Sequence, residues 1–327
     1  MRILLASSID PGAIEALERD HDVVRAFNAP EEQLAELIQD REVVIFRSGV
    51  MISATVLDAA RDLRLLLRAG SGLDNIDVDH ALARGVRIAR VPGSSAQPVA
   101  ELTFALLLSL ARKVTLADRL LREGHWPKSQ LGGPLLAGKT LGIIGAGRIG
   151  SRVGEMGAAW GMRAIGCVAN GGAAVAGSLA QRGVTLTDFD TVVAESDFLC
   201  LHLPLDERTH HIIDASVLSR MKDGSFLVNM ARGGVVDEKA LSAELTEGGR
   251  LLGAALDVHE VEGEGVLSPL ADLPNVVLTP HIGAMAWDAQ RLIGERVLEL
   301  LEAERNGSFA EQLTPDEVVT GSAPQAA

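Results

Sequence analysis

Short apolar runs alternate with amphipathic stretches through the N-terminal part of the chain. The apolar runs lie at 2–7, 22–27, 42–48, 63–70 and 85–91, and stretches with helical spacing lie at 11–20, 30–40 and 53–62. Runs of strand length that are apolar throughout are typical of strands covered on both faces, and their alternation with helices is typical of a parallel sheet. We therefore expect a doubly wound α/β unit here.

A long apolar stretch at 98–124 precedes a second alternation. It has no broad polar face, so we expect one long helix that is buried in a core or against another subunit. Strand-length apolar runs then recur at 139–145, 162–168, 196–204, 224–230, 251–258 and 275–281. The whole pattern predicts two doubly wound units in series.

From Arg305 onward the helical spacing is lost, and Ser, Pro, Gln and Gly become frequent. Segments of this composition near a chain end are commonly poorly ordered. We expect this tail to be mobile or loosely packed.

The charge and cysteine content narrow the class of protein. The 327 residues carry a formal net charge of −14 at pH 7, and there is no basic block, so we expect neither nucleic acid nor an anionic membrane as a partner. Cys167 and Cys200 fall inside strand-like runs, which argues against a disulfide framework. The apolar run at the N-terminus is too short for a signal peptide or a membrane span. These features favour a cytoplasmic enzyme.

The segment LGIIGAGRIG at 141–150 combines a strand-like run with three spaced glycines. In such a segment Gly145 permits a tight turn, Gly147 lets the backbone approach a pyrophosphate, and Gly150 lets the helix lie close to the strand. The pyrophosphate would rest on the positive N-terminus of the helix. A tight turn alone would also explain the glycines, but strand, helix and next strand follow in order, which favours dinucleotide binding.

Polar side chains follow three later strand-like runs: Arg232 in NMARGGVVDE, Asp257 and Glu262 in ALDVHEVEGEG, and His281 in LTPHIGAMAWDAQ. Alone, each could be structural, and we expect the neighbouring Glu260 to lie in a solvated loop. Together they offer an arginine that forks onto a carboxylate, a histidine that exchanges a proton near neutral pH, and a carboxylate that supports the histidine. Since they follow a dinucleotide-binding motif, they predict a 2-hydroxy acid dehydrogenase.

The chain resembles the D-isomer-specific 2-hydroxyacid dehydrogenases, most closely the phosphoglycerate dehydrogenase branch in a short form without a regulatory domain. The matching phrases are RAGSGLDNIDVDHALARGV, GKTLGIIGAGRIG, SDFLCLHLPL, NMARGGVVDE, GAALDVHEVE and TPHIGA. The resemblance implies a Rossmann-type cofactor domain at 98–283, inserted in a flavodoxin-like substrate domain made of 1–97 and 284–327. It also implies hydride transfer between a nicotinamide cofactor and a small D-2-hydroxy acid or 2-keto acid, without a metal.

The resemblance assigns catalysis to Arg232, Glu262 and His281. Arg232 would bind the substrate carboxylate and keto oxygen, His281 would exchange the proton, and Glu262 would support His281. Glu262 is favoured over Glu260 because the family places the acid five positions after Asp257. The aromatic residue and the proline that are usual in this loop are replaced here by His259 and Gly263.

The resemblance also implies residues at the cofactor and at the substrate. Those at the cofactor are Gly145, Gly147, Arg148, Ile149, Gly150, Val168, Leu203, Pro204, Thr209, Met230, Ala231, Asp257, His281 and Gly283. Those at the substrate are Arg47, Ser71, Gly72, Leu73 and Arg232. Arg47, Arg68 and Arg232 are the candidates for attracting an anionic substrate to an acidic protein.

The adenosine end of the cofactor site departs from the family. A dinucleotide-binding unit usually places an acid on the ribose about 20 residues beyond the glycines, but the segment GMRAIGCVANGG at 161–172 contains none, and Val168 stands there. Nor does an Arg follow before Arg182 to bind the phosphate of NADP. We expect the ribose to be held by water, backbone or the Asn170 amide, with NAD modestly preferred and NADP possible.

Two further departures bear on the substrate. Val50 and Met51 replace residues with which phosphoglycerate dehydrogenases often touch the phosphate end, and SAQPVAE at 95–101 alters the family's NxxSVAE wording. We therefore expect a 2-hydroxy acid without choosing 3-phosphoglycerate. Alternatives are an NADPH-dependent glyoxylate or hydroxypyruvate reductase and a dinucleotide-sensing corepressor. We also expect a homodimer with the 98–124 helix in a two-fold interface.

Overall fold

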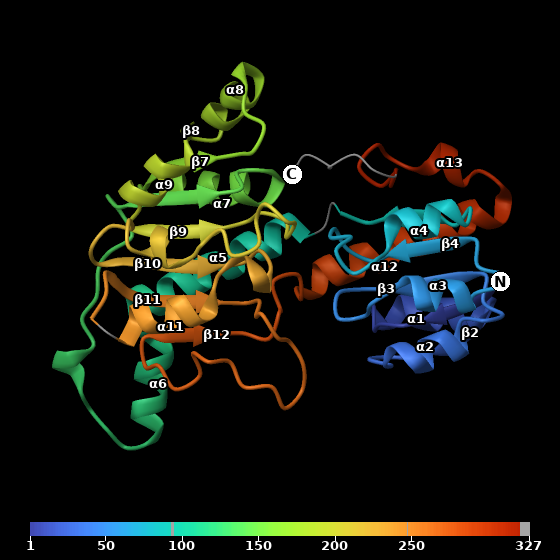
Figure 1. The fold of residues 1–327 in the computed structure, drawn as a ribbon, viewed down its shortest axis with the longest axis horizontal. Helices are drawn as coiled ribbons and strands as arrows, with labels where there is room; N and C mark the ends of the chain where they lie inside the picture. Colours follow the sequence, from blue (N-terminus) through green and yellow to red (C-terminus); the bar gives the residue numbers. More distant parts are fainter. Residues whose placement is uncertain (93–94, 247, 321–327) are drawn as a thin grey trace. The chain divides into compact units, whose positions relative to one another are not determined.

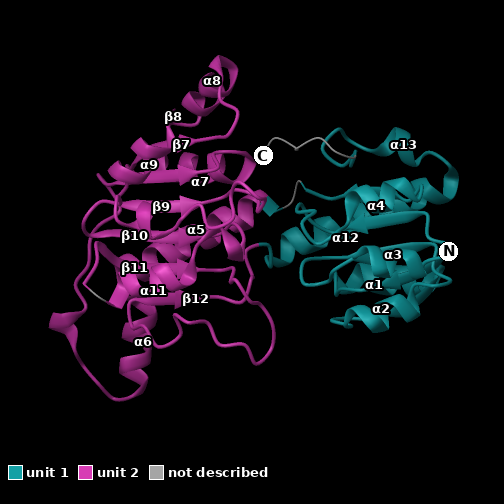
Figure 2. Cartoon of the chain, viewed as in Figure 1, with its two compact units in different colours: residues 1–95, 284–325 teal, residues 96–283, 326–327 magenta. Residues whose placement is uncertain are grey.

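The computed structural model describes residues 1–92, 95–246 and 248–320. The described chain divides into two compact units (Figures 1 and 2). Unit 1 comprises Met1–Ser95 and the chain from Ala284 onward, and unit 2 comprises Ala96–Gly283.

Unit 1 is built on a parallel sheet with the strand order β2-β1-β3-β4-β5, which is the order of flavodoxin-like folds. Its elements are β1 Arg2–Leu5, α1 Pro11–Asp20, β2 Asp22–Arg25, α2 Glu31–Leu37, β3 Val43–Phe46, α3 Ala54–Ala59, β4 Leu65–Arg68, α4 Val78–Ala83, β5 Arg87–Arg90, α12 Trp287–Asn306 and α13 Phe309–Gln312. The expected doubly wound fold is confirmed, and only the short helix α4 was not foreseen among the N-terminal elements.

Both faces of this sheet are covered because its strands are apolar on both sides. Ile3 and Leu5 of β1 face a core with α1 and α12, whereas Leu4 faces a core with α2, α3 and α4. The side chain of Asp10 caps α1 by accepting from the Ala13 amide at 3.1 Å, and Pro11 occupies the first helical position.

The prediction of a loosely packed tail is wrong for its described part. Phe309 of α13 is buried in the unit 1 core, and Val318 forms an antiparallel bridge with Ala89 of β5. Glu317 is 5% exposed and is bound by Arg296 of α12 at 2.8 Å. The composition misled because a few apolar residues and one buried ion pair are enough to dock the segment. Residues 321–327 lie outside the described chain.

Unit 2 is built on a seven-stranded parallel sheet with the order β12-β11-β10-β9-β6-β7-β8. Its elements are α5 Ala96–Ala111, α6 Val114–Arg122, η2 Lys128–Gln130, β6 Thr140–Ile144, α7 Arg148–Ala159, β7 Arg163–Cys167, α8 Ala173–Gln181, β8 Val184–Leu186, α9 Phe189–Glu195, β9 Phe198–Leu201, α10 Ala215–Leu218, β10 Ser225–Asn229, η3 Gly233–Val235, α11 Glu238–Thr246, β11 Leu251–Leu256 and β12 Val276–Leu278. The six expected strands are present, and the short β8 adds an edge.

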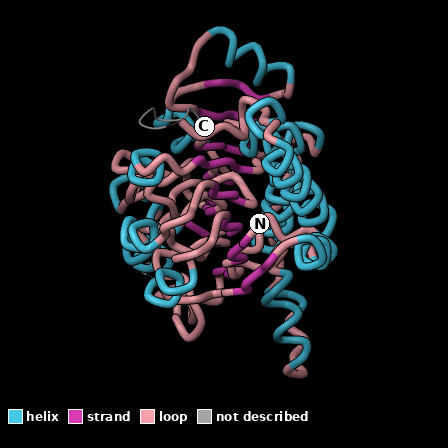
Figure 3. The backbone as a smooth tube through the Cα atoms, turned by 90° about the vertical axis from the view of Figure 1, so that its right-hand side faces the viewer, coloured by secondary structure: helices cyan, strands magenta, loops and turns pink. Residues whose placement is uncertain are grey.

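Helices lie on both faces of this sheet (Figure 3). One core joins α5, α7 and α8 to the strands, and the other joins α9, α10 and α11 to the opposite face. The chain reverses its direction of travel across the sheet between β6 and β9, since β7 and β8 lie on one side of β6 and β9 to β12 on the other. In open α/β sheets such a switch point is where ligands bind, at the carboxyl ends of the strands.

The single long helix expected at 98–124 is in fact two helices. Lys113 adopts a left-handed conformation with φ 52°, which ends α5 and redirects the chain into α6. The apolar faces of α5 are buried within unit 2, against α7 and strands β10 to β12. In contrast, α6 buries none of its residues and extends away from the body of the unit (Figure 1). No helix in the described ranges is long and apolar enough to cross a membrane.

Candidate active site

The three predicted catalytic residues follow three neighbouring strands of unit 2. Arg232 comes after β10, Glu262 after β11 and His281 after β12, and these strands pair in parallel in that order. Because the carboxyl ends of parallel strands lie at one edge, residues separated in sequence reach one region. This edge belongs to the same sheet as the glycine-rich turn after β6.

Glu262 and His281 form a hydrogen-bonded pair. His281 Nδ1 lies 2.9 Å from Glu262 Oε2, and the side chains are 29% and 37% exposed. The remaining nitrogen, Nε2, is the one left to exchange a proton with a substrate. A carboxylate on one nitrogen of a histidine fixes its ring and its proton, which is the arrangement of a general acid–base pair.

The carboxyl group of Glu262 is held in its charged form. Burial alone would raise its pKa, but the hydrogen bond and charge of His281, together with the backbone N–H of His259, outweigh burial, so its pKa lies below the usual value. Glu262 therefore remains an acceptor for His281 at neutral pH.

The backbone of His281 is held in an unusual conformation. Its φ is 53°, a region that residues other than glycine rarely adopt. Its N–H donates to the Asp257 carbonyl at 2.7 Å. The Asp257 carboxylate accepts from Thr279 Oγ1 at 2.7 Å and from the backbone N–H groups of Ile282 and Gly283, both at 2.8 Å. Asp257, which is 2% exposed, thus clamps the segment on which His281 stands.

Arg232 leaves the end of β10 through a braced turn. The Asn229 side chain accepts from the Ala231 N–H at 3.0 Å and donates to the Arg232 carbonyl at 3.0 Å. The Arg232 guanidinium donates to the Ala231 carbonyl at 2.7 Å. The next residue, Gly233, has no room for a side chain because a Cβ there would lie 1.8 Å from the His259 carbonyl oxygen. The Arg232 turn and the Glu262 loop are therefore packed directly on each other.

The glycine-rich turn fits a bound pyrophosphate. Gly145 has φ 89°, and a Cβ there would lie 2.5 Å from the His202 carbonyl oxygen, so only glycine fits. A Cβ at Gly150 would lie 2.3 Å from the Gly145 carbonyl oxygen. Gly147 caps the twelve-residue helix α7 without a side-chain hydrogen bond, so the first-turn N–H groups have no side chain of the cap as their acceptor.

Most other residues expected at the cofactor follow the carboxyl ends of strands in the unit 2 sheet or open α7. Leu203 and Pro204 follow β9, Val168 follows β7, and Met230 and Ala231 follow β10. Thr209 closes the turn after Pro204, since its hydroxyl donates to the Pro204 carbonyl at 2.8 Å and accepts from the Asp206 N–H at 2.7 Å. Arg148 and Ile149 open α7, and Gly283 follows His281.

The residues expected at the substrate in unit 1 also follow adjacent strands. Arg47 comes after β3 and Ser71 to Leu73 after β4. The Arg47 guanidinium lies 3.2 Å from Met285 Sδ. Arg68 differs from the expectation, because it is 5% exposed and donates to the carbonyls of Gly72 at 3.0 Å and Ala69 at 3.3 Å. Arg68 therefore supports the backbone of the 71–73 loop by its hydrogen bond to Gly72.

The contacts of Glu260 with its neighbours were not found from the sequence. Glu260 is exposed, as expected for a solvated loop, and it also accepts from the Glu238 N–H at 3.1 Å and pairs with His211 at 3.0 Å. Glu238 is 2% exposed and accepts from the Glu260 N–H at 2.8 Å. In the sequence, Glu238 is visible only as the second acid of NMARGGVVDE. It lies 22 residues before Glu260, so their spacing gives no sign that the two interact. No group of acidic, histidine or cysteine side chains in the described chain could hold a metal ion.

Comparison with known proteins identifies the chain. Residues 104–283 match the family model for the D-isomer specific 2-hydroxyacid dehydrogenase NAD binding domain. A hydroxypyruvate reductase of Thermotoga maritima is 40% identical over 306 residues, which cover 93% of this chain and 98% of that protein. A D-3-phosphoglycerate dehydrogenase of Methanocaldococcus jannaschii is 39% identical over 96% of this chain, but the chain spans only 59% of that protein.

A solved structure agrees in fold across nearly the whole chain. The D-lactate dehydrogenase of Aquifex aeolicus, crystallised with NAD and lactic acid, has a TM-score of 0.84 and 28% identity, with 98% of this chain and 100% of that chain covered. The two parallel-sheet α/β units of this chain accord in fold with that structure. The chain belongs to the D-isomer-specific 2-hydroxyacid dehydrogenase family and is an NAD-binding oxidoreductase that transfers hydride between the nicotinamide and a 2-hydroxy or 2-keto acid.

Proposed function

We propose that this enzyme reduces a small 2-keto acid to the D-2-hydroxy acid, using Arg232, Glu262 and His281. The observation that carries the proposal is the 2.9 Å Glu262–His281 pair. Its members follow β11 and β12, and β11 pairs with β10, the strand that precedes Arg232. An acid–base pair beside an arginine is what reduction of a 2-keto acid requires, because the developing alkoxide needs a proton and the carboxylate needs a cation.

Each residue has a separate role in this proposal. Arg232 binds the substrate carboxylate and keto oxygen, which orients C2. The nicotinamide supplies the hydride that C2 receives. His281, protonated on both nitrogens, donates its Nε2 proton to the keto oxygen while Glu262 stabilises its charge through Nδ1. In the oxidative direction neutral His281 accepts the hydroxyl proton at the same nitrogen.

The turn after β6 is the proposed site of the cofactor pyrophosphate. Gly145, Gly147 and Gly150 keep the turn free of side chains, and the N-terminus of α7 supplies N–H donors. The family resemblance implies that the other cofactor residues named above, from Val168 to Gly283 in the sequence, also contact the bound cofactor.

From unit 1 we propose that Arg47 and the backbone of Ser71 to Leu73 bind the anionic part of the substrate. Burial lowers the pKa of Arg47, so a bound anion would stabilise the charged guanidinium. Arg68 and Arg90 hold the loop, since Arg90 donates to the Ser71 carbonyl at 3.1 Å and Arg68 to that of Gly72 at 3.0 Å.

We propose a non-phosphorylated substrate of the hydroxypyruvate type. Val50 is buried and Met51 is an exposed apolar side chain, so neither offers a charge to a phosphate. The similarity to the hydroxypyruvate reductase supports this choice.

A panel of 2-keto acids tests the substrate class. We expect hydroxypyruvate or glyoxylate to give a higher kcat/KM with NADH than 3-phosphohydroxypyruvate. A preference for the phosphorylated acid would overturn the proposed class. Failure of every 2-keto acid with both NADH and NADPH would favour the corepressor alternative.

For the cofactor, we propose that NAD is preferred only modestly over NADP. Val168 supplies neither attraction nor repulsion, and Arg182, the next basic residue along the chain, is paired with Glu155 at 3.1 Å. We expect Val168→Asp to tighten NAD and weaken NADP, changing the ratio of dissociation constants roughly 10-fold or more because a charged acceptor is gained.

Val168→Asn is the matched control for this change. The amide can bond the ribose but cannot repel a 2′-phosphate, so NADP affinity should survive. Equilibrium titration of both cofactors measures the effect. A tight, strong NADP preference in the native protein would contradict the proposal.

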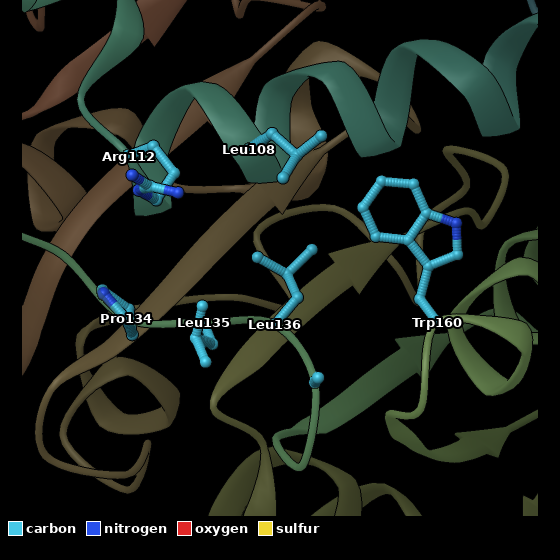
Figure 4. A pocket seen from close by; sticks show the side chains of 7 residues that line it. Leu108, Arg112, Pro134, Leu135, Leu136 and Trp160 are labelled. Atoms are coloured by element: carbon cyan, nitrogen blue, oxygen red, sulfur yellow. The ribbon is translucent and has the colours of Figure 1, made fainter.

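We propose a homodimer in which a second copy covers α6 and the segment that follows it. The lack of a broad polar face at 98–124 suggested an interface helix, but the apolar faces of α5 are buried within unit 2. Exposed apolar side chains occur in α6 and in the segment after it, where Leu121, Trp126 and Leu135 are 57%, 79% and 70% exposed. Leu135 also lines an apolar pocket, together with side chains of α5, other residues of the segment after η2 and Trp160 (Figure 4).

Sedimentation tests this assembly. We expect a dimer at micromolar concentration and a monomer for Leu121→Glu, because the charge would have to be buried in the interface. Leu252→Glu is the control, since Leu252 is similarly exposed at 55% but lies on β11. A native monomer, or equal behaviour of both variants, would refute the interface.

A further inference from the structure

His259 contacts both the loop that carries Glu262 and the segment that carries His281. Its Nε2 is 3.0 Å from the Thr279 carbonyl oxygen, which also accepts the His281 N–H at 3.1 Å. Its own N–H donates to Glu262 Oε1 at 3.2 Å, while Oε2 is bound by His281. One residue therefore braces the segment of the histidine and the carboxylate that supports it.

The hydrogen-bond partners fix the proton on the His259 ring. A carbonyl oxygen only accepts, so Nε2 carries a hydrogen and donates. The other nitrogen, Nδ1, is buried without a hydrogen-bond partner among the described residues, and it faces Glu238 Oε1 at 4.0 Å. The bond to Thr279 is available whether or not Nδ1 is protonated.

The far side of the ring lies near α11, and Glu238 of that helix is tied to the loop of His259 through Glu260. Glu238 accepts from the Glu260 N–H, and its own N–H donates to Glu260 Oε1. Burial raises the pKa of Glu238. The ring of His259 thus fills the space between a fixed helix and the strand end that carries His281, with its side chain only 14% exposed.

We propose that His259 is a positioning residue for the acid–base step, which holds His281 through Thr279 and holds Glu262 through its backbone. The proposal rests on the function proposed above and names a residue that the family resemblance gives only as a replacement of the usual aromatic. A phenylalanine ring at 259 could fill the same space but could not donate to Thr279.

The charged groups that face this ring are few. Glu238 Oε1 lies 4.0 Å from ring Nδ1, and the Glu262 carboxylate accepts from the backbone N–H of His259. Glu260, which pairs with His211, is bonded to Glu238 through the backbone.

Two substitutions separate the donor from the shape. In His259→Phe the ring shape is kept and the donor is lost, and we expect kcat for keto acid reduction to fall about 10-fold or more, since small misplacements of reacting groups are costly. The KM for NADH should stay unchanged, because the cofactor turn lies after β6. In His259→Gln the amide nitrogen can take the place of Nε2, so most of the lost kcat should return.

The pH profile supplies a readout that loss of packing alone would not move. In the reductive direction Glu262 must be charged, so the acid limb of kcat/KM reports its protonation. Burial raises the pKa of Glu262, but the hydrogen bonds that its carboxylate accepts from His281 and from the His259 N–H help to hold the pKa below the usual value. A displacement that weakens these bonds must raise the pKa. We expect the acid limb to move to higher pH in His259→Phe and much less in His259→Gln.

Two reference variants keep the outcome interpretable. His211→Phe removes an imidazole from the other side of Glu260 and should leave both kcat and the acid limb unchanged. His281→Ala reports the proposed function itself. If His281→Ala is active, the acid–base assignment has failed; if it is inactive while His259→Phe equals the native enzyme, only the positioning role has failed.

Folding problems do not remove the test. Should His259→Phe be insoluble, His259→Gln and His259→Asn still differ in reach, because the shorter Asn amide cannot extend to Thr279. Native-like kcat in Gln together with loss in Asn supports the brace. Equal loss in Gln and Asn, or in Gln and Phe, overturns it.

Discussion

Replacement of His281 by alanine is expected to lower turnover by roughly 100- to 10,000-fold, the range contributed by a positioned general acid. The reason is local, since Nδ1 is bound to Glu262 and Nε2 is the group left for the keto oxygen. Cofactor affinity should change little, because the turn that would hold the pyrophosphate follows β6 and not β12. Steady-state kinetics with a 2-keto acid and titration with NADH measure the two quantities separately.

His80→Ala is the matched control for this prediction. His80 also pairs with a carboxylate, Asp58, at 2.8 Å, but it lies on the surface of unit 1. Its loss should leave turnover unchanged. Native turnover in His281→Ala would remove His281 from the mechanism.

Arg232→Lys is expected to fail almost as badly, although the positive charge is retained. An ammonium group cannot form parallel bonds to a carboxylate and a keto oxygen, and the guanidinium of Arg232 is also held by its bond to the Ala231 carbonyl. We expect kcat/KM for the keto acid to fall by roughly 100-fold or more, since orientation at C2 is lost together with binding.

Arg250→Lys provides the comparison for the arginine. Arg250 binds Asp223 at 2.9 Å on the surface and is 49% exposed, so the exchange should have no kinetic effect. Substrate saturation close to native in Arg232→Lys would argue against a two-point clamp.

The fold was largely predictable because its strands are buried on both faces. Such strands are apolar throughout, so they stand out even without a helix-like or alternating period. The prediction failed where backbone conformation decided the outcome. Lys113 turns left-handed between α5 and α6, and no glycine, asparagine or proline marks that position in the sequence.

The site was predictable only where residue type and strand ends coincide. Arg232, Glu262 and His281 each follow a recognisable strand, so topology alone brings them to one edge. The supporting contacts were not predictable, because they join distant loops through backbone atoms. The bond from His259 to the Thr279 carbonyl and the exchange between Glu238 and Glu260 depend on register and loop shape.

The return of α12 to unit 1 has a consequence for biosynthesis. Ile293, Val297 and Leu300 complete the core against α1 and one face of the first sheet. While the ribosome synthesises unit 2, that face remains uncovered and exposes apolar side chains to other chains. Unit 2 is continuous and has all its helices once residue 283 has emerged, so it can fold first, and the N-terminal sheet must wait for the last helix. Conditions that slow the final stretch of translation would therefore increase aggregation through the N-terminal segment.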